Sequence, residues 1–521
     1  MGDCNPDISM LHDPQSGSQS SPLTEGSVTV DLGLPQFDEA ISTKRYCEIA
    51  LWLSYAISVS AIACSIWLLA AEGGLIIAFL PDNVAQGVGG IGLIGELLPL
   101  VFNLLIAGCT EAVSYIHAVS LRWALYREGR LEFNSNLRLF TSAKSSRANT
   151  RSVNFFSAVC LIVCYTAASQ ILIGRRSSIL FNGIALLMLG TGLLSLSIVS
   201  TMCLRDTSNA ILAWSPSPLN TALACLNHDI IVHHRGRGML AVDARYLLAQ
   251  SAKPRRRQCA MNTVYPATRY IIYFQYAVVA LCAILAIIIL VLIRILNTNG
   301  VPTYAFFADE NGTTRLYFEG GNTDPSLYPL WLFCTFLFAV VPQALFVMAL
   351  HGAELLVTVA RDEATWREAA GRHGPGRGAM VAAGALKSAF KSWLWLVLLL
   401  YKPLSSWLLT SQGIKFEIQQ SSSSVVFNPI PLFALTGLLL LLVAFEEWLT
   451  RRRIAGPQPA AYGHLQTLAD LVDDWGPGNI GVEERRLWWG SKGFDQMGDA
   501  LAGTSAKKHC VEEIDFNRRY K

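Results

Sequence analysis

The sequence predicts an all-α, polytopic membrane protein with about eight transmembrane helices, a disordered N-terminus and a cytosolic C-terminal tail. Of its 521 residues, 52% are hydrophobic and only 15% are charged, whereas soluble domains carry about 25% charged residues. The charge is missing in blocks, and each block is long enough to cross a bilayer, which takes about 20 helical residues. Loops rich in Lys and Arg alternate with loops that are poor in them, as expected when successive loops lie on opposite sides of a membrane.

The first 46 residues should form a disordered cytosolic segment. They are rich in Ser, Gly, Pro and Asp and have no periodic apolar positions, so they cannot bury enough apolar surface to fold. No apolar core lies near the start, which argues against a cleaved signal peptide. The first hydrophobic segment would itself act as the targeting signal.

The transmembrane domain is expected over residues 47–450. Its hydrophobic segments cover about 48–70, 93–121, 154–173, 179–203, 270–296, 328–358, 391–411 and 428–449. Pro342 and Gln343 lie near the middle of the sixth segment, which makes it an interior helix packed by the others. Lys402-Pro403 interrupts the seventh segment, so a seven-span topology is the alternative.

The distribution of Lys and Arg predicts which loops face the cytosol. Loops 122–153, 204–269 and 360–391 hold seven, nine and six basic residues, and the last span ends in Arg451-Arg452-Arg453. The opposite loops hold one or none, and Arg175-Arg176 is the exception. With eight spans, the basic loops and both termini lie in the cytosol, whereas an odd number would put the Arg451 cluster outside. The membrane itself would be the plasma membrane or an endomembrane.

Two further observations agree with this topology. The N-glycosylation sequon Asn311-Gly312-Thr313 lies in a loop placed outside, which predicts a glycoprotein modified at Asn311. The outside loops contain no cysteine, and no pair of the twelve cysteines has zinc-ligand spacing, so we interpret all of them as reduced.

A basic cluster immediately before the fifth span is expected to meet the bilayer. Lys253, Arg255, Arg256 and Arg257 stand where anionic lipid headgroups would be in reach. The alternative interpretation is that these charges only set the topology. A net charge of +3 is too small to suggest a nucleic-acid partner.

The tail, residues 451–521, contains one predicted amphipathic helix. Apolar residues recur at intervals of three to four over residues 462–475, and Gly476-Pro477 ends the pattern. Paired tryptophans follow and need a surface to bury against, which would be the bilayer, the cytosolic loops or a partner protein. The candidate docking residues are therefore Leu465, Leu468, Trp475, Trp488 and Trp489.

Several segments resemble a family of fungal multi-pass membrane proteins. In the tail these are GPQPAAYGHLQTLADLVDDW, LWWGSKG and AGTS, and earlier in the chain REGRLEFNSNLRLF, SPSPLNTALA and HGAELLVTVARDEATWR are similar to the same group. The resemblance covers most of the chain from the first span onward. It implies a fungal membrane protein and carries over no functional residue.

The candidate site consists of polar residues within the spans, namely Glu111, Gln343, His351, Glu354 and Lys402. His351 and Glu354 are three residues apart and share one helical face. With Glu111 they would form a carboxylate–imidazole cluster able to relay a proton or hold a metal, or else a structural network between helices. An isolated Lys402 would cost about 2.5–3.5 kcal/mol, which a carboxylate partner would offset. The sequence identifies no further metal ligands, no cofactor site and no catalytic residue.

Three functions stay open. Transport of a small molecule across a fungal membrane, which we favour, would use the interrupted sixth and seventh helices. A receptor or scaffold would act through the cytosolic tail. An intramembrane enzyme would need the Glu111, His351 and Glu354 cluster to be catalytic, but the sequence contains neither GxSxG nor HExxH.

Overall fold

The computed structural model describes residues 36–72, 75–78, 91–175, 178–207, 211–247, 251–296, 316–322, 328–371, 374–419, 422–476, 485–495 and 497–521. Most of the N-terminal segment predicted to be disordered therefore lies outside the described residues. The first helix begins at Ile41, six residues before the predicted boundary.

The chain is mostly helical, and within the described ranges eight helices are long and apolar enough to cross a membrane. They are α1 (Ile41–Glu72), α3 (Ile91–Arg127), α4 (Arg151–Gln170), α5 (Gly183–Thr207), α8 (Ala267–Leu296), α9 (Tyr328–Arg367), α11 (Trp393–Trp407) and α12 (Pro429–Arg451). This confirms the predicted number of helices. Lys402-Pro403 does not divide the seventh, because α11 runs through it and continues as a π-helix, Leu408–Gly413.

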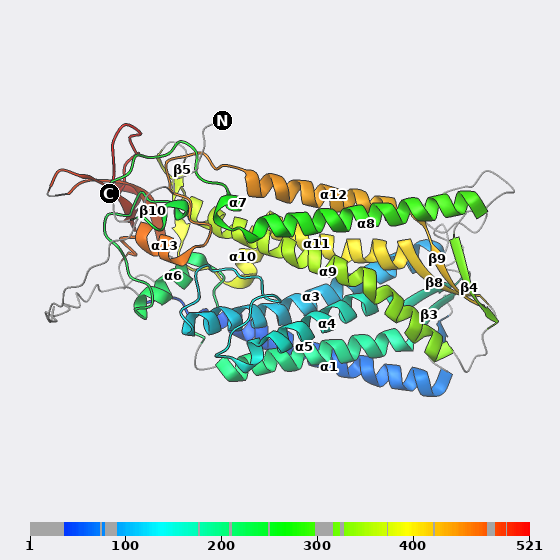
Figure 1. Ribbon diagram of the computed structural model, residues 1–521. Coiled ribbons are helices and arrows are strands. Elements are labelled where there is room, and N and C mark those ends of the chain that lie inside the picture. The colour runs from blue at the N-terminus through cyan, green and yellow to red at the C-terminus, as the bar shows by residue number, and fades with distance from the viewer. Residues whose placement is uncertain are drawn as a thin grey trace, which may run out of the picture. The chain divides into compact units, whose positions relative to one another are not determined.

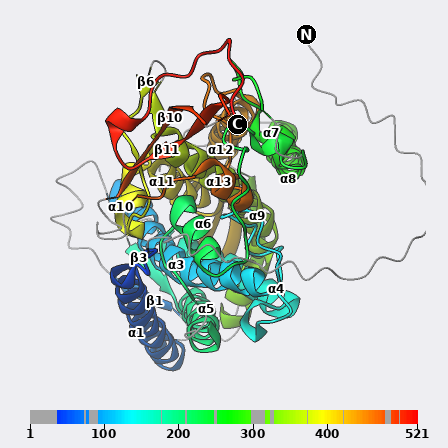
Figure 2. The same cartoon turned by 90° about the vertical axis from the view of Figure 1, so that its left-hand side faces the viewer.

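The eight helices form two groups of four that follow the order of the chain. The first four, α1, α3, α4 and α5, pack on one another, and so do the last four, α8, α9, α11 and α12. The two groups meet where α4 lies against α9 and α3 against α11, as the view along the helices shows (Figure 2). We call these groups the N-terminal and C-terminal halves.

Short antiparallel strands close one end of the bundle, an addition to the predicted all-α class. One sheet has the order β1-β3-β2, formed by β1 (Leu75–Ala78), β2 (Leu172–Arg175) and β3 (Ser178–Asn182). The other has the order β4-β9-β8, formed by β4 (Leu316–Asn322), β8 (Ile414–Gln419) and β9 (Ser422–Phe427). Both lie at the end opposite the C-terminus (Figure 1).

The tail and the basic loops fold together at the other end. The helices there are α6 (Pro218–Asn227), α7 (Met261–Val264), α10 (Ala385–Lys391) and α13 (Leu465–Leu471), with 3₁₀ turns at Arg147–Asn149, Val242–Ala244 and Lys508–Cys510. The strands are β5 (Ala370–Gly371), β6 (Gly374–Pro375), β7 (Ala379–Met380), β10 (Arg486–Phe494) and β11 (Ala500–Ser505). β5 pairs with β6, and the others form a sheet of order β11-β10-β7.

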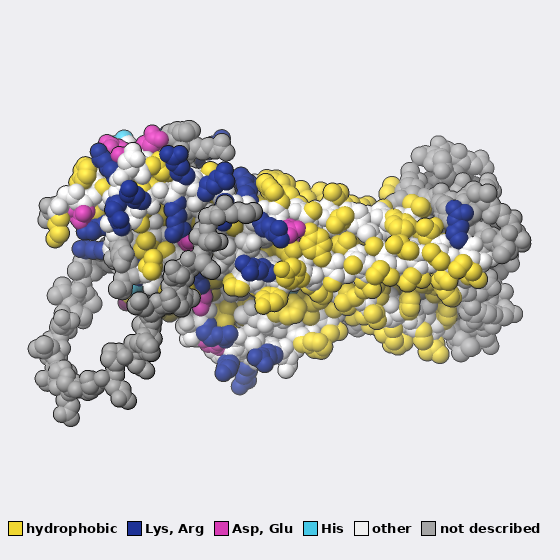
Figure 3. All heavy atoms as spheres, turned by 45° about the horizontal axis from the view of Figure 1, so that its top comes forward, with side chains coloured by type: hydrophobic (Ala, Val, Ile, Leu, Met, Phe, Trp, Pro, Cys, Tyr) yellow, Lys and Arg dark blue, Asp and Glu magenta, His cyan; other side chains and the backbone are white. Residues whose placement is uncertain are grey.

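Pairing between distant segments holds the tail in place. Phe133 pairs with His464, Ala252 with Tyr520 and Arg257 with Ala455. The loops that the sequence groups by their basic residues and the C-terminal tail therefore share one end of the bundle, as an even number of spans requires. Figure 3 shows Lys and Arg gathered at this end, beside a broad apolar surface over the helices.

The tail helix is shorter than predicted. α13 spans Leu465–Leu471 instead of residues 462–475. Tyr462 and Gly463 both have positive φ, 47° and 73°, a conformation that a right-handed helix excludes. The apolar residues at both ends of the predicted helix are nonetheless buried, because the extended backbone also packs against the loops.

Candidate functional site

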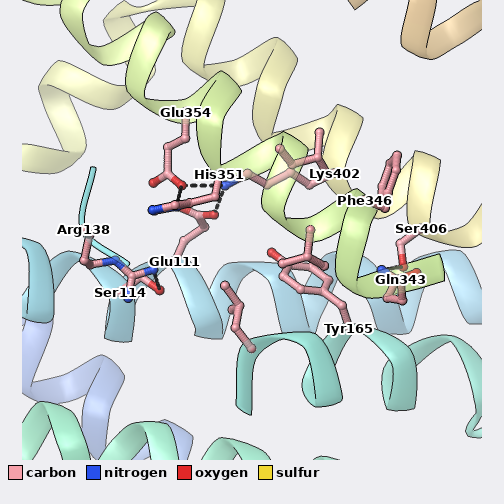
Figure 4. Close-up of a pocket in the computed structure, with 13 residues that line it drawn as sticks. Glu111, Ser114, Arg138, Tyr165, Gln343, Phe346, His351, Glu354, Lys402 and Ser406 are labelled. Carbon is pink, nitrogen blue, oxygen red and sulfur yellow. Dashed lines mark hydrogen bonds and ion pairs between the residues drawn. The ribbon is translucent and has the colours of Figure 1, made fainter. Parts of the chain in front are cut away.

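The predicted polar residues meet at the junction of the two halves. Glu111 comes from α3 in the N-terminal half, His351 and Glu354 from α9, and Lys402 from α11. All of them, with Gln343, line one small cavity whose other walls are Ser114, Arg138, Leu161, Tyr165, Phe346, Val347, Leu350 and Ser406. The sequence predicted five residues of this site, and the fold brings all five together (Figure 4).

Lys402 links the two halves. Its side chain is 8% exposed and points between two carboxylates, forming an ion pair with Glu111 and a second one with Glu354, Nζ to Oε2 3.4 Å. Glu111 belongs to the N-terminal half, whereas Lys402 and Glu354 belong to the C-terminal half. The attraction of the two carboxylates offsets most of the free-energy cost of burying the ammonium group only when both partners are held in place. The ion pair with Glu111 therefore joins the two halves.

His351 connects the ion pairs to the loop that follows α3. The backbone N–H of Leu139 donates to His351 Nε2 at 3.3 Å, so this nitrogen carries the lone pair and the ring proton is on Nδ1. Nδ1 faces Glu354, 3.4 Å from Oε2. The same Glu354 oxygen is thus shared by Lys402 and His351, and adding a second proton to the imidazole would break the contact with Leu139.

Arg138 is the member of the cluster that the sequence analysis missed. It lies in the loop after α3, is buried, and donates from Nη2 to Ser114 Oγ at 3.1 Å, with Nη1 3.3 Å from His117 Nδ1. Burial lowers the pKa of Arg138, and the charges of Glu354 and Glu111 oppose that shift. The positive charges of Arg138 and Lys402 together balance the negative charges of Glu111 and Glu354. In the sequence Arg138 is one of the seven basic residues of loop 122–153, and its only signal is the apolar sequence around it, Leu137 and Leu139-Phe140.

The cavity continues from the charged cluster toward the middle of α9. Gln343 Nε2 donates to Ser406 Oγ at 3.1 Å across α9 and α11, while its Oε1 is buried without a hydrogen-bond partner among the described residues. The space has room for water but not for a metabolite. In this conformation the halves are closed around the polar residues.

Each helix that supplies a charge to the cluster is irregular. Pro99, Pro342 and Pro403 lie inside α3, α9 and α11. A proline removes one backbone hydrogen bond and bends the helix, and neighbouring helices or polar side chains must satisfy the carbonyl group it frees. The π-helix that follows α11 is a second irregularity of a kind often found at functional sites.

The tail residues predicted to dock a partner are buried or partly buried within the chain. Leu465 and Leu468 are fully buried, and Trp475 and Trp489 are 4% and 2% exposed. Trp488 is partly buried, its ring lying against the backbone at Gly378. Among the described residues, α13 packs against α6 and the Trp488 ring lies at Gly378, so the loops of the same chain supply surface for these side chains. Docking of a partner protein at the tail stays a prediction.

Two further predictions concern glycosylation and metal binding. The predicted glycosylation site, Asn311, lies outside the described residues. Across the part of the chain that the structure describes, no group of three or more His, Cys, Asp or Glu could hold a metal ion; in the cluster itself the space between the carboxylates is filled by Lys402.

Comparison with known proteins adds no identity: no family model matches the chain, and neither a curated protein nor a solved structure is detectably similar to it. The resemblance of the tail to fungal membrane proteins stays a prediction.

Proposed function

We propose that this chain transports a small polar solute across a membrane, and that the ion pairs of Lys402 with Glu111 and Glu354 close the path between its two halves. The observation that carries the proposal is that the Lys402–Glu111 pair crosses the junction between the N-terminal and C-terminal halves, while Glu354 holds Lys402 from within the C-terminal half. Ionisable residues within membrane spans are costly and usually mark pathways for substrates, ions or protons.

A contact of this kind has two discrete states. It is intact when the halves are together and broken when they separate, and a ligand shifts that equilibrium if it binds one state better. A solute with a charged or strongly polar group can replace one partner of Lys402 and so lower the free energy of opening. The irregular α9 and α11, which line the cavity, supply the segments that bend.

The shared Glu354 oxygen favours coupling to protons. Neutralising Glu354 removes one of the two anions that hold Lys402 and also the anion that faces His351 Nδ1. Proton uptake at this carboxylate would therefore weaken the hold on Lys402 within the C-terminal half, whereas proton uptake at Glu111 would break the pair that crosses the junction. Chains of carboxylates and histidines serve as proton relays in membrane transporters.

The finer topology is part of the proposal. We infer that the end of the bundle holding the tail faces the cytosol, because the loops rich in Lys and Arg gather there. The proposed solute then moves between the cytosol and the space on the other side, whichever membrane holds the protein.

Metabolite profiling of cells and medium would test transport. Cells lacking the chain would be complemented with the wild type, with Glu354→Gln, or with Glu368→Gln as a matched control. Glu368 lies one residue beyond α9 in an exposed ion pair with Lys391, 2.7 Å. Transport predicts that known compounds move between the cell and medium pools, that Glu354→Gln fails to restore them at equal protein abundance, and that Glu368→Gln restores them.

Two outcomes would contradict transport. If one compound accumulates in both pools while another disappears, the chain is an enzyme. If neither pool changes on deletion, neither transport nor catalysis is its function, and a receptor or scaffold role for the tail becomes the working hypothesis.

A further inference from the structure

Two basic segments that are 198 residues apart in sequence meet at one edge of the bundle. Hydrogen bonds join residues 256–258, just before α7 and α8, to residues 454–456, just after α12. Gln258 N–H donates to Ile454 O at 2.8 Å, and Gly456 N–H donates to Arg256 O at 3.1 Å. Arg257 pairs with Ala455, two residues after Arg453. The predicted cluster around Arg255 is therefore continued by the arginines at the end of α12.

The combined surface, which we call the basic collar, is exposed and mostly unpaired. Its members are all solvent-exposed: Lys253, Arg255, Arg256, Arg257, Arg269, Arg451, Arg452 and Arg453. Arg255 pairs with Asp243 and Arg451 with Glu447, both at 2.5 Å. The other six form no ion pair with a carboxylate among the described residues, so the collar keeps a strong positive potential.

Aromatic side chains place the collar at the level of lipid headgroups. Trp448 near the end of α12, and Tyr270 and Tyr273 near the start of α8, are more than half exposed, and such residues are typical of the membrane–water interface. The guanidinium of Arg452 lies over the Trp448 ring, 5.1 Å from its centre. Figure 3 shows an apolar surface over the helices beside the end where Lys and Arg gather.

We propose that the basic collar is a binding site for the phosphate groups of anionic phospholipids. Guanidinium groups match phosphate in geometry and charge, and a bidentate contact is among the stronger polar interactions in proteins. A lipid meets both parts of the surface at once, with its headgroup phosphate on the arginines and its acyl chains on the apolar face of α8 and α12. A soluble phosphate or a nucleic acid would use only the first part. This inference is independent of the proposed transport.

Lipid titration of the full-length chain in detergent, followed by native mass spectrometry, would test the collar. The probes are dioctanoyl phosphatidylserine, dioctanoyl phosphatidylinositol bisphosphate, dioctanoyl phosphatidylcholine and inorganic phosphate. The collar variant is Lys253→Gln/Arg257→Gln/Arg453→Gln. The matched control is Lys144→Gln/Arg147→Gln/Arg151→Gln, which removes three exposed charges elsewhere at the same end. All six positions are exposed, so both variants should fold.

We expect both anionic lipids to bind the wild type in preference to phosphatidylcholine, and the bisphosphate to bind more tightly. One basic side chain near an anionic surface accounts for roughly a fivefold change in affinity, so the collar variant should bind about 100-fold more weakly. The control variant should lose less than about fivefold. Arg257→Lys/Arg453→Lys, which keeps the charges, should stay within about tenfold of the wild type.

Three results would overturn the proposal. Equal losses in the collar and control variants would mean that only the overall positive charge matters. Equal binding of phosphatidylcholine would mean that the headgroup is not recognised. Competition by inorganic phosphate at the concentration of the lipid would assign the collar to a soluble anion.

Discussion

Replacing Lys402 with methionine tests whether the ion pairs hold the two halves together. The substitution keeps much of the side-chain volume but leaves Glu111 and Glu354 facing each other without their cation. Removing one partner of a buried ion pair costs about 3–5 kcal/mol. Because Glu354 is 30% exposed, solvent screens part of the repulsion, and we expect the lower figure, about 3 kcal/mol.

A charge-balanced double variant separates stability from function. Lys402→Met/Glu111→Gln leaves Glu354 with Arg138, a cation whose charged form Glu354 already stabilises. Replacing both members of a buried pair with neutral groups is often close to neutral in stability. The double variant should therefore recover most of the lost stability and should still fail to transport, because the contact between the halves is absent.

Thermal unfolding of the purified chain would measure both effects, followed by the fluorescence of its 13 tryptophans. With roughly 2 cal/mol/K of unfolding entropy per residue, a chain of this length loses about 1 °C of midpoint per kcal/mol, so Lys402→Met should unfold roughly 3 °C lower. Lys391→Met, at an exposed ion pair, should change the midpoint by less than about 1 °C. The reasoning would be refuted if Lys402→Met unfolded at the same temperature as the wild type. It would also be refuted if Lys402→Met/Glu111→Gln were no more stable than Lys402→Met.

The remaining predictions concern the tail and the packing of the helices. Burial lowers the pKa of His464 to about 4, assisted by the charge of Arg245; the unfolded tail therefore takes up a proton at higher pH than the folded one. Stability from this group is complete above about pH 6.5 and falls by up to about 3 kcal/mol as the pH approaches 4. Amide exchange in α13, corrected for its intrinsic pH dependence, should quicken over that range, and His464→Asn, which keeps a capping acceptor, should abolish the effect. The backbone N–H groups of Ala461 and Tyr462 donate to Glu363 Oε2 at 2.9 and 2.7 Å. Glu363→Ala removes this acceptor and should lower the free energy of unfolding by about 3 kcal/mol. The loss would appear as faster amide exchange at residues 458–464. Gly190→Val puts a Cβ 2.7 Å from Ile62 Cγ1 of α1 and should lower the thermal midpoint by roughly 1–3 °C, whereas Gly437→Val, whose Cβ meets nothing within 4 Å, should leave it unchanged.

Hydropathy predicted the helices well because the physical cause is local. A helix in hydrocarbon satisfies its own backbone hydrogen bonds, so about 20 apolar residues suffice to specify it. The five polar residues of the site could be predicted for the related reason that each is costly where it stands. Their mutual arrangement was open, since Glu111 and Lys402 are 291 residues apart in sequence and only the packing of α3 against α11 brings them together.

The sequence was less informative outside the spans. Arg138 was indistinguishable from the other loop charges, because its burial depends on how the loop after α3 folds back over His117 and His351. The strands of the tail were missed because β10 and β11 are stabilised by pairing with each other and with β7, and not by a strong alternating pattern. Periodicity also extended the tail helix across Tyr462 and Gly463, whose positive φ values end it.

The site and the tail are joined by one helix, and this constrains how the protein can move. α9 has 40 residues, about 60 Å, twice the thickness of a hydrocarbon core. Glu354 in the cluster is about 14 Å along it from Glu363, which binds the tail. Pro342, the proline inside α9, lies on the far side of Glu354, so no proline interrupts the helix between Glu354 and Glu363 and we expect that stretch to move as one body. Opening of the halves must then move the tail as well, and we expect Lys402→Met to quicken amide exchange at residues 458–464. Unchanged exchange there would mean that α9 bends between the two sites.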